Sequence, residues 1–380
     1  MLRSFSFLLL FCIPCLLHSQ EPTDGFFRKL NKNERFDAGA PIFSGIIIPV
    51  YTPETDFSFH AAGAVTLKTK RNNSYLCHSV IPVSALVNPQ QSLMLNLHPV
   101  LYWFDDRVLI DINTDYRNMK DNYWGIGSDK ISSVEKGNFT TGYQRKSLLF
   151  QSRILFKITS GFYAGFASDI HSFKASNLAD LMMEDPEILI YGTDIYSSGL
   201  GIVAFYDKRN PINPVVPGMY IEIKGVSFLK ELNSDYNYQN IGFDYRHFIP
   251  IIRKGSVLGL QAKSSLNFGD VPWTDMPQSG GSTDLRGYYQ GQYRDNHMLL
   301  FQTEYRHFFY RSETNKLSRH GFVFWLSGGT VFYGIKEIKN IILSTGAGYR
   351  YRMQPNVTLR IDVGLGTENA GIYLGLNEAF

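Results

Sequence analysis

The chain has 380 residues, of which 44% are hydrophobic, 19% charged and 14% aromatic, and its formal net charge is +3. Apart from one stretch at its start, it contains no run of about 20 apolar residues, so a bundle of membrane-spanning helices is excluded. The small net charge provides no basic footprint for nucleic acid, which we exclude as a partner.

The first residues have the features of a secretory signal peptide. Arg3 gives a basic start, Leu8–Leu17 is apolar, and the small Ser19 suits cleavage. We therefore predict three parts: a signal peptide over residues 1–19, a short periplasmic segment over 20–43, and one folded unit over 44–380.

From Ser44 onward, apolar and polar residues alternate with a period of two, which is typical of strands. Each alternating segment has at least about 8–10 residues, the length of a tilted membrane strand, and ordinary soluble sheets have shorter and fewer strands. The only expected helix is Leu178–Glu184. We predict an all-β fold, a sixteen-stranded antiparallel transmembrane β-barrel, whose strands lie within Ser44–Tyr51, Asp56–Thr69, Ser74–Ala85, Ser92–Trp103, Arg107–Asp115, Thr141–Ile158, Gly161–Phe173, Ser197–Asp207, Met219–Phe228, Tyr236–Ile249, Ser256–Phe268, His297–Tyr310, Gly321–Tyr333, Asn340–Met353, Asn356–Gly366 and Gly371–Phe380.

The alternation also assigns a face to each side chain, because neighbouring residues of a strand point to opposite sides of the sheet. Within Asn356–Gly366, the charged Arg360 and Asp362 share one face, and Ile361 and Val363 lie on the other. A charge facing lipid costs a few kcal/mol, so we expect the charged faces to line the lumen.

The most specific motif is Leu285-Arg286-Gly287-Tyr288, in a Gly-rich stretch between the eleventh and twelfth predicted strands. It resembles the loop-6 motif of the Omp85 superfamily, which includes the barrels of BamA, TamA and two-partner-secretion translocators. Weaker matches to the family are Asp207-Lys208-Arg209-Asn210 followed by Pro214, Pro217 and Gly218; Leu359-Arg360-Ile361-Asp362-Val363-Gly364; Tyr51–Thr55; and Tyr123–Gly127.

The resemblance implies a function without a chemical reaction and without a cofactor. Such a barrel would lie in the bacterial outer membrane, with both termini in the periplasm. It would insert or translocate outer-membrane proteins, or lipids, through its lumen and a lateral seam. The implied partners are outer-membrane lipids, client outer-membrane proteins and accessory envelope proteins.

The resemblance also implies that loop 6 folds into the lumen. There Arg286 would need a carboxylate partner with matching geometry, and the candidates on the lumen face are Asp362 first and Glu304 second. The alternative is a loop that stays outside in solvent. The family usually places an acid on the strand after loop 6, where this chain has Ser327.

Two further expectations concern the ends of the barrel. Family members usually carry periplasmic POTRA domains ahead of the barrel, and residues 20–43 are too few for one, so the chain resembles the barrel-only group. Between the first and last strands, Pro49 lacks an N–H and would weaken the seam. The terminal aromatic Phe380 resembles the residue by which such barrels are recognised for assembly, and we expect it on the last strand.

Three other functions are compatible with a barrel: a passive outer-membrane pore, a barrel enzyme such as an outer-membrane phospholipase, and a scaffold subunit of an envelope complex. The nine histidines have no metal-binding spacing of the His-Glu-x-x-His kind, and no Gly-x-Ser-x-Gly motif occurs. We therefore predict no metal site and no catalytic residue.

Overall fold

The computed structural model describes residues 39–70, 76–90, 92–128, 135–209, 217–251, 254–311, 316–338, 340–354, 357–367 and 369–380. The predicted signal peptide and almost all of the predicted periplasmic segment therefore lie outside the described residues. β1 begins at Ile42, two residues before the predicted start of the barrel.

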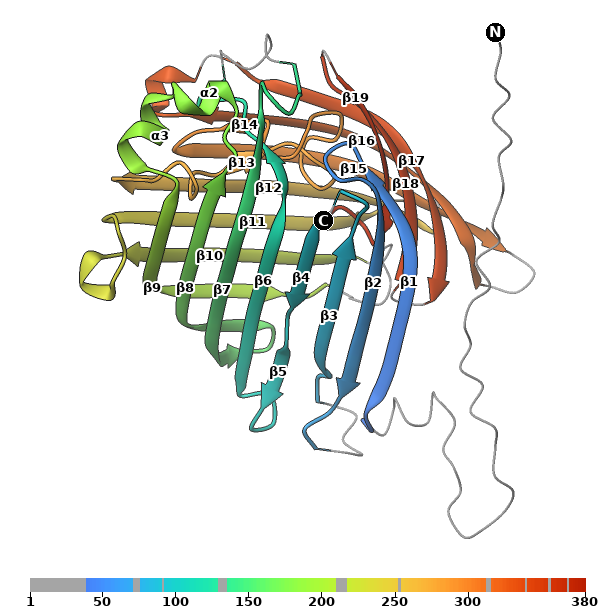
Figure 1. Cartoon of the computed structure of the whole chain (residues 1–380). Coiled ribbons are helices and arrows are strands. Elements are labelled where there is room, and N and C mark those ends of the chain that lie inside the picture. The colour runs from blue at the N-terminus through green and yellow to red at the C-terminus, as the bar shows by residue number, and fades with distance from the viewer. Residues whose placement is uncertain are drawn as a thin grey trace, which may run out of the picture.

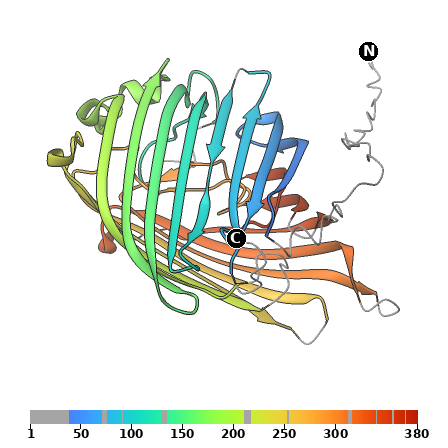
Figure 2. The same ribbon diagram turned by 90° about the horizontal axis from the view of Figure 1, so that it is seen from below.

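The chain forms a closed antiparallel β-barrel, in which β1 lies beside the C-terminal strands (Figures 1 and 2). The strands of its wall are β1 (Ile42–Thr52), β2 (Asp56–Leu67), β3 (Ser79–Val87), β4 (Leu93–Leu97), β5 (Val100–Trp103), β6 (Val108–Asn122), β7 (Gly142–Thr159), β8 (Phe162–Ser176), β9 (Asp194–Asp207), β10 (Gly218–Phe228), β11 (Tyr238–Pro250), β12 (Ser256–Gly269), β15 (His297–Arg311), β16 (Lys316–Phe332), β17 (Ile342–Gln354), β18 (Val357–Leu365) and β19 (Ala370–Leu376).

β4 and β5 are two halves of one strand, because both pair with β3 on one side and β6 on the other. The break falls at His98 and Pro99, and proline cannot donate a ladder hydrogen bond. The wall therefore has sixteen strands, and the predicted fold class is confirmed.

The two faces of the wall differ as the alternation predicted. On β18, Ile361 and Val363 are exposed on the outside of the barrel, whereas Arg360 and Asp362 are buried on the inside. Ion pairs line the lumen elsewhere too. For example, Arg153 on β7 bonds to both Asp111 on β6 and Glu222 on β10. Charged side chains thus meet water and one another, and the outer surface is apolar.

The prediction for Phe380 was wrong, because the last strand ends at Leu376. Asn377 adopts a left-handed conformation (φ 62°), and its amide donates to the carbonyl oxygen of Thr358 at 2.6 Å. This turn directs the tail inward, where the ring of Phe380 stacks on the lumen-facing ring of Phe248, 6.2 Å between centroids. Phe380 is therefore not part of the seam.

We call the rim where β12 ends and β15 begins the loop-6 rim. At this rim, between β8 and β9, lie two short helices, α2 (Asp180–Met183) and α3 (Pro186–Tyr191). α2 falls within the helix predicted from the sequence, and α3, which begins with Pro186 after the capping Asp185, was not predicted. Short 3₁₀ turns are η2 (Lys230–Leu232) and η3 (Ile335–Glu337). No helix in the described part of the chain has the length and apolar character needed to cross a bilayer.

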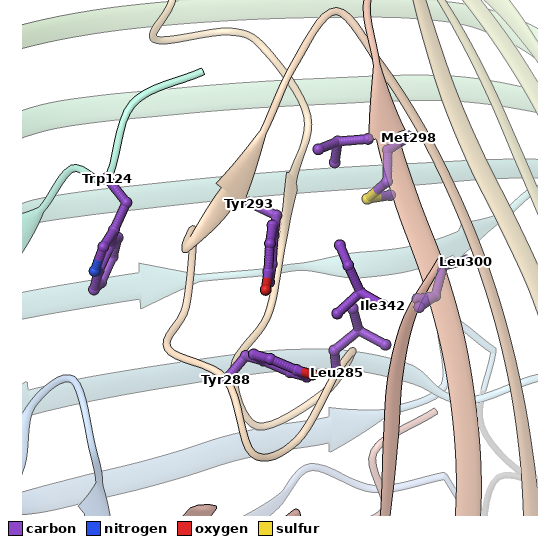
Figure 3. Close-up of a cluster of buried hydrophobic side chains, with 8 residues drawn as sticks. Trp124, Leu285, Tyr288, Tyr293, Met298, Leu300 and Ile342 are labelled. Atoms are coloured by element: carbon purple, nitrogen blue, oxygen red, sulfur yellow. The ribbon is translucent and has the colours of Figure 1, made fainter. Parts of the chain in front are cut away.

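Loop 6 (residues 270–296) folds from this rim into the lumen. It contains a small hairpin of β13 (Gln278–Ser279) and β14 (Tyr293–Arg294), which forms a sheet separate from the wall. Leu285, Tyr288 and Tyr293 of the loop pack against wall residues that include Leu300 and Ile342 (Figure 3). The loop thus fills part of the lumen and brings its tip to the inner wall.

Candidate functional site

The tip of loop 6 places Arg286 in a fully buried position inside the barrel. Nη1 of Arg286 donates to Asp362 Oδ2 on β18 at 3.0 Å, and Nη2 donates to Glu304 on β15. The guanidinium also lies over the Trp325 ring of β16, 3.7 Å from the ring centroid. The structure thus brings Arg286 into contact with both carboxylates that the sequence offered as alternatives.

Arg286 is the centre of a chain of buried charges with alternating sign. Glu304 also accepts from Arg306 Nε at 2.8 Å, and Asp362 also accepts from Arg350 on β17. Arg350 in turn donates through Nε to Glu378 of the C-terminal tail at 2.8 Å. Buried charges are tolerated when each has opposite partners and hydrogen bonds, so the network joins three wall strands (β15, β17 and β18), the loop tip and the tail.

The backbone of the tip is held as closely as its side chain. Gly287 has a φ of +116°, a conformation that residues with a side chain rarely adopt, and it lies against Leu365 and Gly366. A side chain on Gly364 would place its Cβ 2.5 Å from the carbonyl carbon of Arg286. Ser344 on β17 donates a hydrogen bond to the Arg286 carbonyl oxygen. Glycine at 287 and 364 therefore permits the loop to sit on the wall.

Ser327, at the position where an acid was expected, also faces the lumen and is buried. Its hydroxyl donates to Gln302 Oε1 at 3.0 Å, and Gln302 Nε2 donates to the carbonyl oxygen of Thr283 in loop 6 at 3.0 Å. This side of the loop is thus bound by neutral hydrogen bonds, and Arg286 takes its acidic partners from β15 and β18.

A second attachment point, which the sequence did not indicate, holds loop 6 near its start. Asp275 accepts hydrogen bonds from Ser197 at 2.6 Å and Tyr238 at 3.0 Å, and His171 contacts its other oxygen. Burial alone would raise the pKa of Asp275, but His171 and the two hydroxyls outweigh burial and lower it. Asp275 therefore stays ionised and fastens the loop to β8, β9 and β11.

The remaining residues singled out in the sequence lie away from Arg286 or beside its ion network. Arg209 donates to Asp207 at 2.7 Å at the rim opposite loop 6, and Gly218 packs against Arg209 there. Asn210 and Pro214 lie outside the described residues. Arg360 lies on the lumen wall with its Nη1 3.9 Å from Asp362.

The seam between β1 and β19 has little backbone pairing. In the described chain, Tyr51 and Leu374 are the only residues paired between the two strands, whereas β1 pairs with β2 along its whole length. Pro49 lies opposite Phe59 in that second ladder and has no N–H to donate to a neighbouring strand.

Asp295, near the end of loop 6, is expected to make stability depend on pH. Burial raises the pKa of Asp295 to about 6, because the uncharged carboxyl is easier to bury than the carboxylate. The protonated carboxyl therefore adds to the free energy of unfolding below the ordinary aspartate pKa, and this stabilisation is lost as pH rises through 6. We expect Asp295→Asn to raise the free energy of unfolding by about 1 kcal/mol at pH 8, with no gain at pH 4.

Urea unfolding of the detergent-solubilised barrel at both pH values measures this difference. The control Asp194→Asn removes an exposed carboxylate at the same rim and should give no gain that grows with pH. A gain from Asp295→Asn that is equal at both pH values would contradict the prediction.

Comparison with known proteins supports the fold. BamA from Haemophilus ducreyi lacking POTRA domains 1–3 superposes with a TM-score of 0.57 at 16% identity, covering 90% of this chain and 70% of that one. CdiB from Acinetobacter baumannii superposes with a TM-score of 0.56 at 11% identity, covering 88% of this chain, which spans 59% of CdiB. No family model and no curated protein sequence matches the chain. With loop 6 in its lumen, the chain is a sixteen-stranded β-barrel whose fold is similar to those of these two structural neighbours.

Proposed function

We propose that this barrel inserts or translocates outer-membrane proteins, or lipids, by opening its seam laterally into the outer membrane. The loop-6 rim would face the cell exterior, and the opposite rim, with both ends of the barrel, would face the periplasm. The work is done by binding and conformational change, without a chemical reaction or a cofactor.

The observation that carries this proposal is the weak closure between β1 and β19. Among the described residues, and with β4 and β5 counted as one strand, every other neighbouring pair of wall strands is joined by a ladder of several residue pairs, whereas β1 and β19 share one pair. Each missing pair lowers the free energy needed to separate the strands. An exposed strand edge is also a template on which another strand can pair.

The filled lumen favours this function over a passive pore. Loop 6 and the tail lie inside the barrel, and a buried ion network attaches both to the wall. An open pore needs only a charged lining and gains nothing from a buried loop tip. A steady conductance that is independent of Arg286 would favour the pore instead.

A disulfide across the seam tests the proposal. We expect Tyr51→Cys with Leu374→Cys, in a Cys77→Ser background, to lock the seam when oxidised, because these positions face each other. In cells depleted of the native protein, the oxidised variant should fail to maintain outer-membrane protein levels, and a reductant should restore them.

The matched control is Val363→Cys with Ile372→Cys, which crosslinks β18 to β19 where the ladder is complete. Both control positions face outward, and their disulfide should leave activity unchanged. Full activity of the oxidised seam variant would overturn lateral opening.

A further inference from the structure

Loop 6 contacts both sides of the seam as well as the ion network. On one side stands β19, whose Tyr373 is buried and points at the loop tip. The amide of Gly287 donates to the Tyr373 hydroxyl at 2.9 Å, and this hydroxyl donates to the carbonyl oxygen of Tyr288 at 3.2 Å. The tip is therefore bonded to the last strand of the barrel.

Tyr288 strengthens this attachment through its own side chain. Its hydroxyl donates to the carbonyl oxygen of Leu343 at 3.0 Å and accepts from the amide of Thr367 at 2.8 Å, just before β19 begins. The ring packs in the buried cluster with Leu285 (Figure 3). The tip is thus seated on β17, β18 and the connection into β19.

On the other side of the seam is the hairpin turn that joins β1 to β2. The amide of Gln290 donates to Glu54 Oε1 in this turn at 2.7 Å. Lys136, from the connection between β6 and β7, donates to the carbonyl oxygen of Pro53 at 2.6 Å and lies 5.0 Å from the ring centroid of Tyr289. Four consecutive loop residues, from Gly287 to Gln290, therefore span from β19 to the β1–β2 turn.

We propose that the tip of loop 6 is a clasp that holds the seam closed, with Tyr373 and Glu54 as the positioning residues on its two sides. This inference rests on the proposed function and adds its control: the clasp must release at least one side before β1 and β19 separate. The position of the clasp fits that role. It lies at the loop-6 rim, close to Tyr51 and Leu374, where the two strands pair.

The geometry explains why a loop is needed for this purpose. A single ladder pair contributes little by itself, since the net gain from one hydrogen bond is small. The clasp adds bonds from a segment that the buried ion network already orders, so less conformational freedom is lost when they form. Release of Arg286 would loosen the clasp and the seam together.

The rate of disulfide formation between cysteines at positions 51 and 374, in the Cys77→Ser background, reports on seam closure without any cargo. We expect Glu54→Ala, which removes one hydrogen bond, and Tyr373→Phe, which removes two, each to slow crosslinking by at least about three- to five-fold. Together they should slow it about ten-fold or more. Tyr373→Phe keeps the ring and removes only the hydroxyl, so the barrel should still fold, which heat-modifiable gel mobility checks.

Two variants serve as matched controls. Tyr220→Phe removes a lumen hydroxyl on β10 that bonds to Glu222, and Glu231→Ala removes an exposed carboxylate at the loop-6 rim. Both should crosslink at the native rate. An unchanged rate in the folded Tyr373→Phe, Glu54→Ala double variant would overturn the clasp.

The outcomes for the clasp and for the proposed function can be separated. Slower crosslinking in the double variant supports the clasp. If the locked seam nevertheless leaves outer-membrane protein levels intact, that second result contradicts lateral transport and not the clasp. Conversely, a locked seam that abolishes activity, with crosslinking insensitive to the double variant, supports lateral opening and sinks the clasp.

Discussion

Replacing Arg286 with alanine is expected to lower the free energy of unfolding by about 3–5 kcal/mol, the cost of breaking a buried ion pair by removing one partner. Glu304 would lose a bond and keep Arg306, and Asp362 would lose a bond and keep Arg350, with Arg360 at 3.9 Å. Urea unfolding of the barrel in detergent measures the loss. Arg286→Lys should recover little, because an ammonium cannot bridge two carboxylates with the fixed fork of a guanidinium.

A double-mutant cycle shows whether the pairing is direct. We expect Arg286→Ala and Asp362→Ala each to be costly and their combination to cost less than the sum, with a coupling of about 1–3 kcal/mol. The control is Arg209→Ala, which breaks a half-exposed pair with Asp207 at the opposite rim and should cost less than about 1 kcal/mol. Additive losses from Arg286→Ala and Asp362→Ala would contradict the pairing.

Gly364→Ala is expected to unseat loop 6 without removing any charged group. The added Cβ would lie 2.5 Å from the carbonyl carbon and 2.6 Å from the carbonyl oxygen of Arg286. Both are backbone atoms that cannot rotate away. Overpacking of this kind costs about 1–3 kcal/mol, and displacement of the tip would add the loss of the ion network.

Trypsin offers a direct measurement, because Arg286 is fully buried while the loop is seated. We expect Gly364→Ala to expose the bond after Arg286 to cleavage in the intact barrel. Gly225→Ala is the matched control: it also adds a methyl to a wall strand, but no atom lies within 4 Å of its Cβ. Resistance of Gly364→Ala equal to that of the native barrel would show that the wall accommodates the methyl with the tip in place.

These two predictions bear on function through the seam. The tip of loop 6 is held by Arg286, by close backbone approach at Gly287 and Gly364, and by Tyr373 of the last strand. A variant that unseats the tip should therefore weaken the closure of the barrel as well as its stability. Loss of the ion network should therefore make β1 and β19 easier to separate.

Strand number and the choice of face follow from the sequence because they depend on neighbours one and two residues apart. The alternation around Arg360 and Asp362 assigns both to the lumen without reference to any other strand. The Arg286–Gly287 motif likewise marks one loop. Periodicity also suggested a terminal strand reaching Phe380, and here it was wrong, because a single left-handed residue, Asn377, turns the tail into the lumen.

The contacts that make the site were decided by the tertiary structure. Arg286 meets Asp362 across 76 positions of the chain, and His171 meets Asp275 across 104. Such pairs depend on the register of every intervening strand and on the path of the loop. The alternation places Glu304 and Asp362 on the same face and gives no distance to Arg286. Only the closed barrel brings both carboxylates to one guanidinium, and Tyr373 and Glu54 to one loop, because closure brings the first and last strands together.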